Sequence, residues 1–126
     1  MKKIFLGLIL LIITISIIIF LVYQNTQKQK AEARVAIDTT FGLADVTKDY
    51  TDQLRSCLDA SANAKLSDGR QFELAMEIYD QSEKAFNDEE YSKAISLARE
   101  SFNLITEFRS QFDAVVLPRK TANLCN

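Results

Sequence analysis

An uncharged apolar run stands near the start of the chain, from Ile4 to Tyr23, and reads IFLGLILLIITISIIIFLVY. About 20 residues at a helical rise of roughly 1.5 Å each cover about 30 Å, the thickness of the hydrocarbon core of a bilayer. The pattern therefore predicts a membrane-spanning helix, and we expect residues 1–23 to form an N-terminal membrane anchor. Positions typical of this anchor are Ile4, Phe5, Leu6, Leu10, Ile15, Phe20 and Tyr23.

The same N-terminal pattern also fits a secretory signal peptide, which is removed from the mature protein. Two features favour an uncleaved anchor. The apolar run is longer than the roughly 7–15 residues of a signal-peptide core, and bulky or polar residues at 22–25 stand where a cleavage site needs small ones. A weaker small-residue site, Ala31-Glu32-Ala33, lies well beyond the run.

Basic residues flank both ends of the apolar run, so the positive-inside rule does not decide the orientation. They are Lys2 and Lys3 before the run, and Lys28, Lys30 and Arg34 after it. The short N-terminal tail resembles that of ordinary signal-anchors and favours a cytoplasmic N-terminus. We expect a single-pass protein of the cell membrane, in contact with the lipid bilayer, whose C-terminal domain lies outside the cytoplasm.

The residues after the anchor are polar at first and then become amphipathic. Residues 24–32 contain no helix breaker and predict a polar stalk that continues the membrane helix. Residues 33–65 predict the first helix of the domain, in which the apolar stripe moves to a second face at Gly42. The shift fits a bend, two segments packed on different neighbours, or a continuous helix with a weak spot. The first stripe is Ala33, Ile37, Phe41 and Ala44, and the second is Leu43, Val46, Tyr50, Leu54 and Cys57.

A second helix is predicted over residues 69–86. Ser67 to Gly69 marks a break in the helical pattern, and Asp68 with Gln71 forms a capping box that starts the helix. The apolar residues of this helix cover about half of its circumference, which is wider than the stripe of a helix with one buried face. We therefore expect it to touch two neighbours and to lie at the centre of the domain.

A third helix is predicted over residues 88–116. We expect Asn87 to cap it, with Glu90 three positions later, because acidic residues in the first turn suit the helix dipole. Apolar residues then follow a seven-residue pattern as far as Val115. We expect the helix to stop before Pro118, because the residue preceding a proline is pushed out of the α region. Residues 118–126 form a short C-terminal tail.

No alternation typical of strands occurs in the chain, so we expect an all-α fold. It consists of the transmembrane helix followed by a small three-helix bundle, an αα-hairpin module, over residues 33–117. Glu100 and Glu107 are expected to face water on the third helix. The residues expected in the core are Phe72, Tyr79, Phe86, Tyr91, Ala94, Ala98, Phe102 and Phe108.

Small and aromatic residues surround the turn at residues 87–89, namely Ser82, Ala85, Tyr91, Ala94, Ala98, Ser101 and Phe102. With them, the stretch 78–102 resembles one helical hairpin of the tetratricopeptide (TPR) family, in which small residues let two antiparallel helices approach closely. The chain departs from the family pattern, because Ser82 stands where glycine is favoured, Ser101 stands where alanine is favoured, and the closing proline is absent. One repeat does not form the family's binding groove, and a generic helical hairpin is the alternative interpretation.

Charge and composition narrow the classes of function. The chain has 15 basic and 17 acidic residues, and without Lys2 and Lys3 the part after the anchor has 13 basic residues and a net charge of −4. A mildly acidic domain lacks the basic face that nucleic-acid binding needs. The chain contains no His, the residue most often used as a general base and as a metal ligand.

Two groups of carboxylates have the spacing of a cation site or an acid–base pair, and both also fit solvated helix faces. They are Asp49 with Asp52, and Asp88 with Glu89 and Glu90. No nucleophile stands beside a base in any recognisable pattern. We therefore expect no catalytic, cofactor-binding or metal-binding residues, no nucleic-acid partner and no small-molecule substrate, and we do not expect an enzyme.

Cys57 and Cys125 are the only cysteines. If the first helix leaves the membrane, the second returns towards it and the third runs away again, so the first and third helices end together. Residues 118–124 span about 20 Å when extended, which lets the two sulfur atoms meet. We predict a Cys57–Cys125 disulfide in an oxidising compartment; the alternative is two free thiols in a cytoplasmic domain.

These features predict a membrane-anchored helical module that binds or positions another, unidentified envelope or membrane protein, as a structural scaffold. The alternative is a small regulatory subunit of a larger membrane complex, acting through its transmembrane helix. An enzyme is the least favoured of the three classes.

Overall fold

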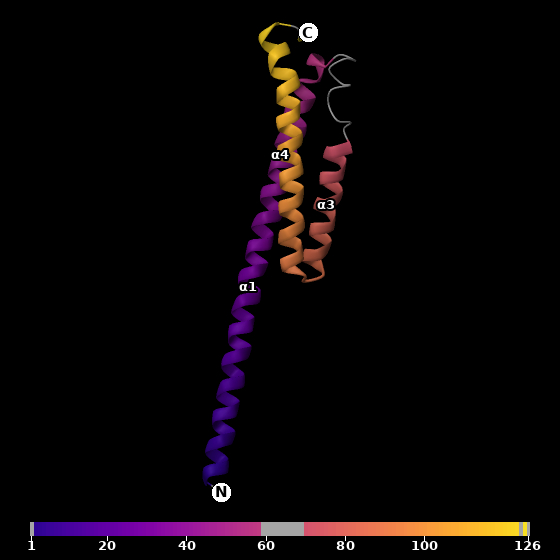
Figure 1. Ribbon diagram of the computed structural model, residues 1–126. Helices are drawn as coiled ribbons and strands as arrows, with labels where there is room; N and C mark the ends of the chain where they lie inside the picture. The colour runs from indigo at the N-terminus through magenta and orange to yellow at the C-terminus, as the bar shows by residue number, and fades with distance from the viewer. Residues whose placement is uncertain (1, 59–69, 124, 126) are drawn as a thin grey trace.

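The fold is described by a computed structural model, which covers residues 2–58, 70–123 and 125 (Figure 1). Throughout these ranges all regular structure is helical, so the expected all-α class is confirmed. The capping residue Asp68 and the predicted helical residues 59–65 lie outside the described residues.

Three long helices and one short turn make up the described structure. Helix α1 is Lys2–Gln53, and the 3-10 turn η1 at Arg55–Cys57 follows it. Helix α3 is Arg70–Asn87, and helix α4 is Tyr91–Thr121. Figure 1 shows α1 and α4 running in the same direction and α3 running against them, with α3 and α4 packed on the C-terminal half of α1.

Helix α1 is continuous through Gly42, where the sequence pattern allowed either a bend or a continuous helix. Gly42 lies on an exposed face, and a Cβ atom added there meets nothing within 4 Å. The glycine is therefore not needed for close packing or for a turn. A single glycine in a long helix costs about 1 kcal/mol relative to alanine, which is too little to interrupt it.

The predicted shift of the buried stripe at Gly42 is confirmed only in part. Leu43, Tyr50, Leu54 and Cys57 of the second stripe pack in the core, but threonines also continue the first stripe. The fully or nearly fully buried positions of α1 alternate in steps of four and three residues: Ala33, Ile37, Thr40, Ala44 and Thr47. Phe41 and Val46, which were assigned to the stripes, are 55% and 56% exposed. The small threonine side chains let the neighbouring helix approach, and the steps match the seam of helices that pack nearly parallel.

Helix α4 lies between the other two helices, in the place that the sequence assigned to the second helix. The Thr40 hydroxyl of α1 donates a hydrogen bond to the Ala98 carbonyl oxygen of α4 over 3.0 Å. The Ser101 hydroxyl of α4 donates to the Ala75 carbonyl oxygen of α3 over 2.6 Å. Helices α1 and α3 share a smaller contact. The apolar residues of α3 cover more of its surface than its two neighbours bury, because the contact with α1 is smaller than the contact with α4. Part of this apolar surface is therefore half-exposed.

The turn between α3 and α4 is a Schellman motif, and the predicted cap by Asn87 is wrong. The Glu90 amide donates to the Ala85 carbonyl oxygen over 2.8 Å, and the Glu89 amide donates to the Phe86 carbonyl oxygen over 3.1 Å. Asn87 is the last residue of α3, and Glu90 is the N-cap of α4 without a side-chain hydrogen bond. Glu89 has a φ of 62°, the left-handed conformation that usually selects glycine.

The ends of α1 and α4 differ from the predicted ends. Helix α1 stops at Gln53 instead of residue 65, and Leu58 is already extended. Helix α4 continues through Pro118 to Thr121. The proline removes one backbone hydrogen bond, but Arg119 in the same turn donates from Nε to the Cys57 carbonyl oxygen over 2.7 Å. This contact holds the last turn of α4 against the end of α1.

The expected core residues divide into two groups. Tyr79, Tyr91, Ala94 and Ala98 are buried, whereas the four phenylalanines are half-buried at the edges of the core: Phe72, Phe86, Phe102 and Phe108. Glu100 and Glu107 are exposed, as expected. The fully or nearly fully buried side chains further along α4 are Ser101, Ile105, Phe112 and Val116. With Ala94 and Ala98 they recur in steps of four, three, four, seven and four residues and fill the seam between the helices.

Replacing threonine with valine should change the stability of the fold in opposite directions at Thr40 and at Thr47. The Thr47 hydroxyl is buried without a hydrogen-bond partner in the described part of the chain, whereas the Thr40 hydroxyl reaches both Ala36 and Ala98. We expect Thr47→Val to stabilise the fold by about 1 kcal/mol and Thr40→Val to destabilise it by about as much. Thermal unfolding of the full-length chain in detergent measures both; shifts of the same sign would contradict these assignments.

The strained Schellman residue gives a second prediction. Glu89→Gly should stabilise the fold by about 1 kcal/mol, because glycine has no steric cost at positive φ. Asp88→Gly is the matched control and should give no gain, since Asp88 is not among the described residues with positive φ. Equal melting temperatures for Glu89→Gly and the unmodified chain would show that the turn does not hold this residue at positive φ.

Candidate functional site

The apolar part of α1 projects from the packed helices as a bare helix (Figure 1). It is long and apolar enough to cross a membrane, by length and composition. The predicted anchor positions with described side chains are all exposed: Phe5, Leu6, Leu10, Ile15, Phe20 and Tyr23. Ile4 belongs to α1, but its side chain lies outside the described part.

Two hydroxyls inside the apolar segment bond to their own helix. Thr14 donates to the Leu11 carbonyl oxygen and Ser16 donates to the Ile12 carbonyl oxygen, each over 2.9 Å. Such bonds satisfy the hydroxyls without a second helix. The surface that the segment offers to its surroundings is therefore almost entirely apolar.

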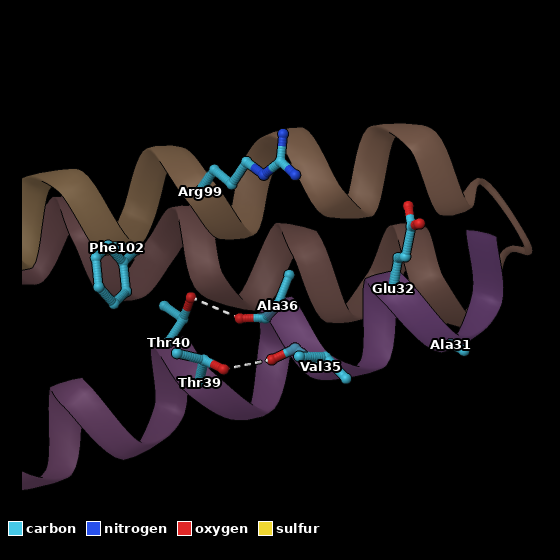
Figure 2. A pocket seen from close by; sticks show the side chains of 8 residues that line it. All are labelled: Ala31, Glu32, Val35, Ala36, Thr39, Thr40, Arg99 and Phe102. Carbon is cyan, nitrogen blue, oxygen red and sulfur yellow. Dashed lines mark hydrogen bonds between the residues drawn. The ribbon is translucent and has the colours of Figure 1, made fainter. Parts of the chain in front are cut away.

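A groove lies between α1 and α4, close to the point where the apolar segment ends (Figure 2). Its volume is about 540 Å³. No residue of α3 lines it; the lining comes from one stretch of α1 and one of α4, namely Ala31, Glu32, Val35, Ala36, Thr39, Thr40, Arg99 and Phe102. The groove forms because the residues of α1 that face Phe102 of α4 are small and do not fill the space between the two helices.

The groove carries one charge of each sign. Glu32 on α1 pairs with Lys28 one turn earlier over 3.9 Å, and both side chains are more than half exposed. Arg99 on α4 is exposed, and the described part of the chain gives it no ion-pair partner. In Figure 2 the two charged side chains extend from opposite helices above the apolar floor. An apolar surface with an acid on one wall and a base on the other suits a protein partner with matching charges.

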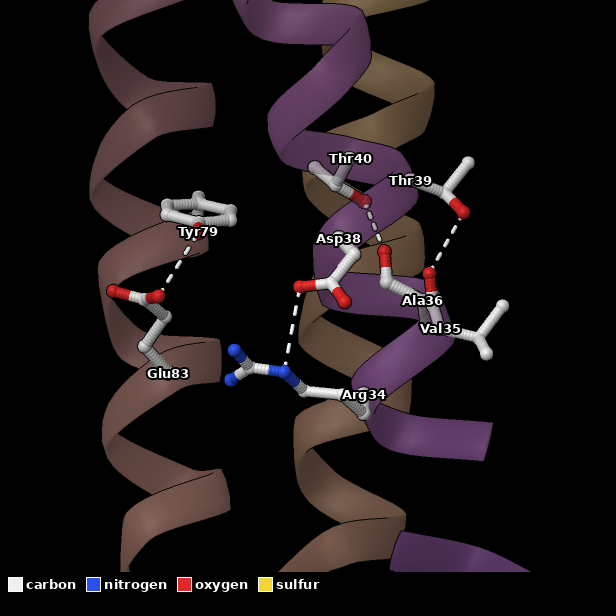
Figure 3. Close-up of polar contacts among 8 residues, drawn as sticks. All are labelled: Arg34, Val35, Ala36, Asp38, Thr39, Thr40, Tyr79 and Glu83. Atoms are coloured by element: carbon white, nitrogen blue, oxygen red, sulfur yellow. Dashed lines mark hydrogen bonds and ion pairs between the residues drawn. The ribbon is translucent and has the colours of Figure 1, made fainter. Parts of the chain in front are cut away.

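On the other side of α1, polar side chains of α1 and α3 lie near each other, and the hydrogen bonds and ion pair drawn in Figure 3 each stay within one helix. Arg34 pairs with Asp38 over 3.4 Å, and its guanidinium lies 5.8 Å from the centre of the Phe86 ring. The Tyr79 hydroxyl donates to Glu83 over 2.9 Å. Burial and this hydrogen bond raise the pKa of Tyr79 to about 12. Of these contacts, the one between Arg34 and the Phe86 ring links α1 to α3.

The two cysteines meet at the far end of the domain. The sulfur atoms of Cys57 and Cys125 are at disulfide distance, 1.97 Å apart. Cys57 is buried against Phe112 and Val116 of α4. Nearby, the Tyr50 hydroxyl donates to Asp113 over 2.7 Å, and this hydrogen bond, with burial, raises the pKa of Tyr50. The end of α1, the end of α4 and the tail are thus held together.

The paired carboxylates are exposed, Asp49 and Asp52 on α1 and Asp88 to Glu90 in the turn between α3 and α4. Asp49 accepts a hydrogen bond from Gln53, Asp52 pairs with Arg55 over 3.1 Å, and Glu90 pairs with Lys93 over 2.7 Å. Over the described ranges, no three His, Cys, Asp or Glu side chains are grouped as metal ligands. The partners of Asp49, Asp52 and Glu90 stand three or four residues away along the chain, and Asp88 lines a small pocket with Lys84 and Lys93.

Comparison with known proteins gives no relative: no family model, no curated protein and no solved structure matches the chain. The resemblance of residues 78–102 to a TPR hairpin therefore remains an expectation. The sequence analysis missed the groove, because its walls come from helices that are adjacent only in the folded chain. One signal in the sequence could have indicated the groove: Val35 is an apolar residue on the face opposite the first apolar stripe, where a polar residue is expected.

Tyr79 gives a prediction for alkaline pH. A folded-state pKa of about 12, above the value of about 10 for an unfolded tyrosine, means that folding favours the neutral phenol. Its stabilisation is complete below pH 10 and is lost as the pH rises to about 12. Unfolding of the full chain between pH 9 and 12 should show this loss, and Tyr79→Phe should reduce it. Identical pH profiles for the two chains would contradict the assignment.

Proposed function

We propose that this protein is a single-pass membrane protein that holds a small helical bundle outside the cytoplasm as a binding scaffold for membrane or envelope proteins. The observation that carries the proposal is the continuity of α1. One helix of 52 residues includes both the apolar segment and the first helix of the bundle. Residues 24–32 are part of it, so no flexible joint separates the anchor from the bundle.

A continuous helix fixes the height and the direction of everything packed on it. Residues 24–32 add about 13 Å at a helical rise of 1.5 Å per residue. The groove begins at Ala31, about 12 Å beyond Tyr23 on the same scale. A partner in the same membrane thus meets the groove near the bilayer surface, at a fixed height and on a fixed side.

The cysteine pair supports a location outside the cytoplasm. Disulfides persist in oxidising compartments and are rare in the cytosol. The two residues are 68 positions apart, and closing such a loop stabilises a fold by about 4 kcal/mol in the chain-entropy model. A small domain has only about 5–15 kcal/mol in total, so this bond matters for its stability.

The alternative function, a regulatory subunit acting through its transmembrane helix, has less support. Polar side chains that bridge helices are one means of association inside membranes. Thr14 and Ser16 instead bond to carbonyl oxygens of their own helix. The groove outside the apolar segment is the better-formed recognition surface, so we favour the scaffold.

A photo-crosslinking experiment tests the proposal. A photoreactive residue at Val35, in the groove, should form discrete adducts with proteins in carbonate-washed membranes. The matched control is Leu74 on α3, which is also an exposed apolar residue and lies outside the groove. Release of the chain by carbonate would show that it is not anchored in the membrane. Equal adducts at Val35 and Leu74 would show that the groove is not the binding surface.

The same membranes test the location. Thiol blocking without reductant should leave Cys57 and Cys125 unmodified in the intact mass, because they are bonded to each other. Blocking after reduction is the control and should add two groups. Two blocked cysteines before reduction would place the bundle in a reducing compartment.

A further inference from the structure

We infer that residues 23–30 of α1, which we call the stalk base, bind the headgroups of anionic phospholipids in the leaflet that α1 leaves. The inference rests on the proposed function, because it takes the apolar part of α1 as a membrane anchor, and it goes further by naming a class of lipid. Three features of the described chain support it: the height of the stalk base, the direction of its side chains, and the separation of bases from acids.

The continuous helix fixes the distance of the stalk base from the hydrocarbon core. With Tyr23 at the end of the apolar run, Lys28 lies about 8 Å and Lys30 about 11 Å beyond it along the helix axis. The polar layer on each side of a bilayer is roughly 5–7 Å thick, since about 30 Å of a total of 40–45 Å is hydrocarbon. The backbone of residues 24–27 therefore lies in the headgroup layer, and the two lysines start just outside it.

The side chains of the stalk base point back towards the bilayer. The Cα–Cβ bonds of an α-helix tilt towards its N-terminus, and the N-terminal part of α1 is the apolar segment. Both lysines are exposed, and the long aliphatic stem of a lysine lets its ammonium group reach the level of the lipid phosphates. Lys30 has no ion-pair partner among the described residues, whereas Lys28 lies 3.9 Å from Glu32.

Uncharged donors lie below the two lysines. Gln24, Asn25 and Gln27 carry side-chain amides, and amides can donate hydrogen bonds to phosphate oxygens. Together with Leu21, Tyr23 and Lys28, these three residues line one open hollow on the surface of the helix. An apolar residue at its lower end and an ammonium group at its upper end match a phospholipid, whose acyl chains lie below its phosphate.

The acids of this end of the molecule lie higher than the bases. Residues 24–31 contain two lysines and no acid, and Glu32 is the first acid after the apolar run. The acidic turn at residues 88–90 is at the end of the bundle nearest the apolar segment (Figure 1), at the level of Ala33, which packs in one cluster with Tyr91. That level is about 15 Å beyond the apolar run and outside the headgroup layer. The headgroups therefore meet the basic part of the stalk, which favours anionic over zwitterionic lipids.

Lipid retention by the full-length chain tests the inference. The chain is reconstituted into vesicles of equal phosphatidylcholine and phosphatidylglycerol, solubilised in mild detergent and purified, and the retained phospholipids are measured by mass spectrometry. A lysine near an anionic surface strengthens binding about fivefold, and the ion pair with Glu32 reduces the share of Lys28. We expect phosphatidylglycerol to be enriched about tenfold by the unmodified chain, and less than about twofold by the double variant Lys28→Gln with Lys30→Gln.

Lys48→Gln with Lys120→Gln is the matched control, because it removes the same charge from exposed lysines near the other ends of α1 and α4, and it should keep the enrichment. Equal retention of the two lipids by the unmodified chain, or equal loss of enrichment in both double variants, would overturn the inference. Inorganic phosphate added at constant ionic strength should leave the retained lipid unchanged, and displacement would mean that the stalk base binds free phosphate instead. Carbonate washing tests the anchor separately: a chain that stays in the membrane and retains both lipids equally would refute the lipid selectivity alone.

Discussion

The structure depends on one helix that does not end where its apolar segment ends. Helix α1 continues for 30 residues after Tyr23, and the packed part of the molecule is built on its C-terminal half. A short polar helix alone in water is marginal, because forming its first turn is unfavourable. In this chain residues 24–32 extend helices that are already formed on both sides. Packing on α4 therefore supports the stalk as well as the domain.

Contact between α1 and α4 is close because the buried residues are small. Ala33 of α1 packs in one cluster with Ala94 and Ala98 of α4, and Ala44 packs in the next cluster with Ile105. The Thr40 hydroxyl reaches the Ala98 carbonyl oxygen across the gap. At the other end the cysteine pair joins the end of α1 to the tail after α4. The two parallel helices are thus held along their length and at their ends. Helix α3 is attached mainly to α4 and leaves one side of the α1–α4 pair open as the groove.

The sequence predicted the features that depend on strong local patterns. The apolar run, the number of long helices and the cysteine pairing follow from length, period and topology. It did not predict features decided by neighbours in space. Thr40 and Thr47 are polar residues that helix packing buries, and Glu89 takes a left-handed conformation in the turn between two fixed helices. Helix α4 continues past Pro118, and Arg119 donates a hydrogen bond to the Cys57 carbonyl oxygen. Four phenylalanines were assigned to the core by size but are half-buried at its edges, whereas Phe112 and smaller residues fill it.

Hydrogen exchange of the backbone amides at residues 24–32, in the full-length chain in lipid bilayers, tests the central claim most directly. A continuous helix predicts that these exposed amides exchange at least about tenfold more slowly than the same sequence as an unstructured peptide, with similar protection through residues 33–37. Exchange at the unstructured rate over 24–32, between protected segments on both sides, would show a flexible joint. The bundle would then have no fixed height or direction above the membrane, which would contradict a rigid scaffold built on α1.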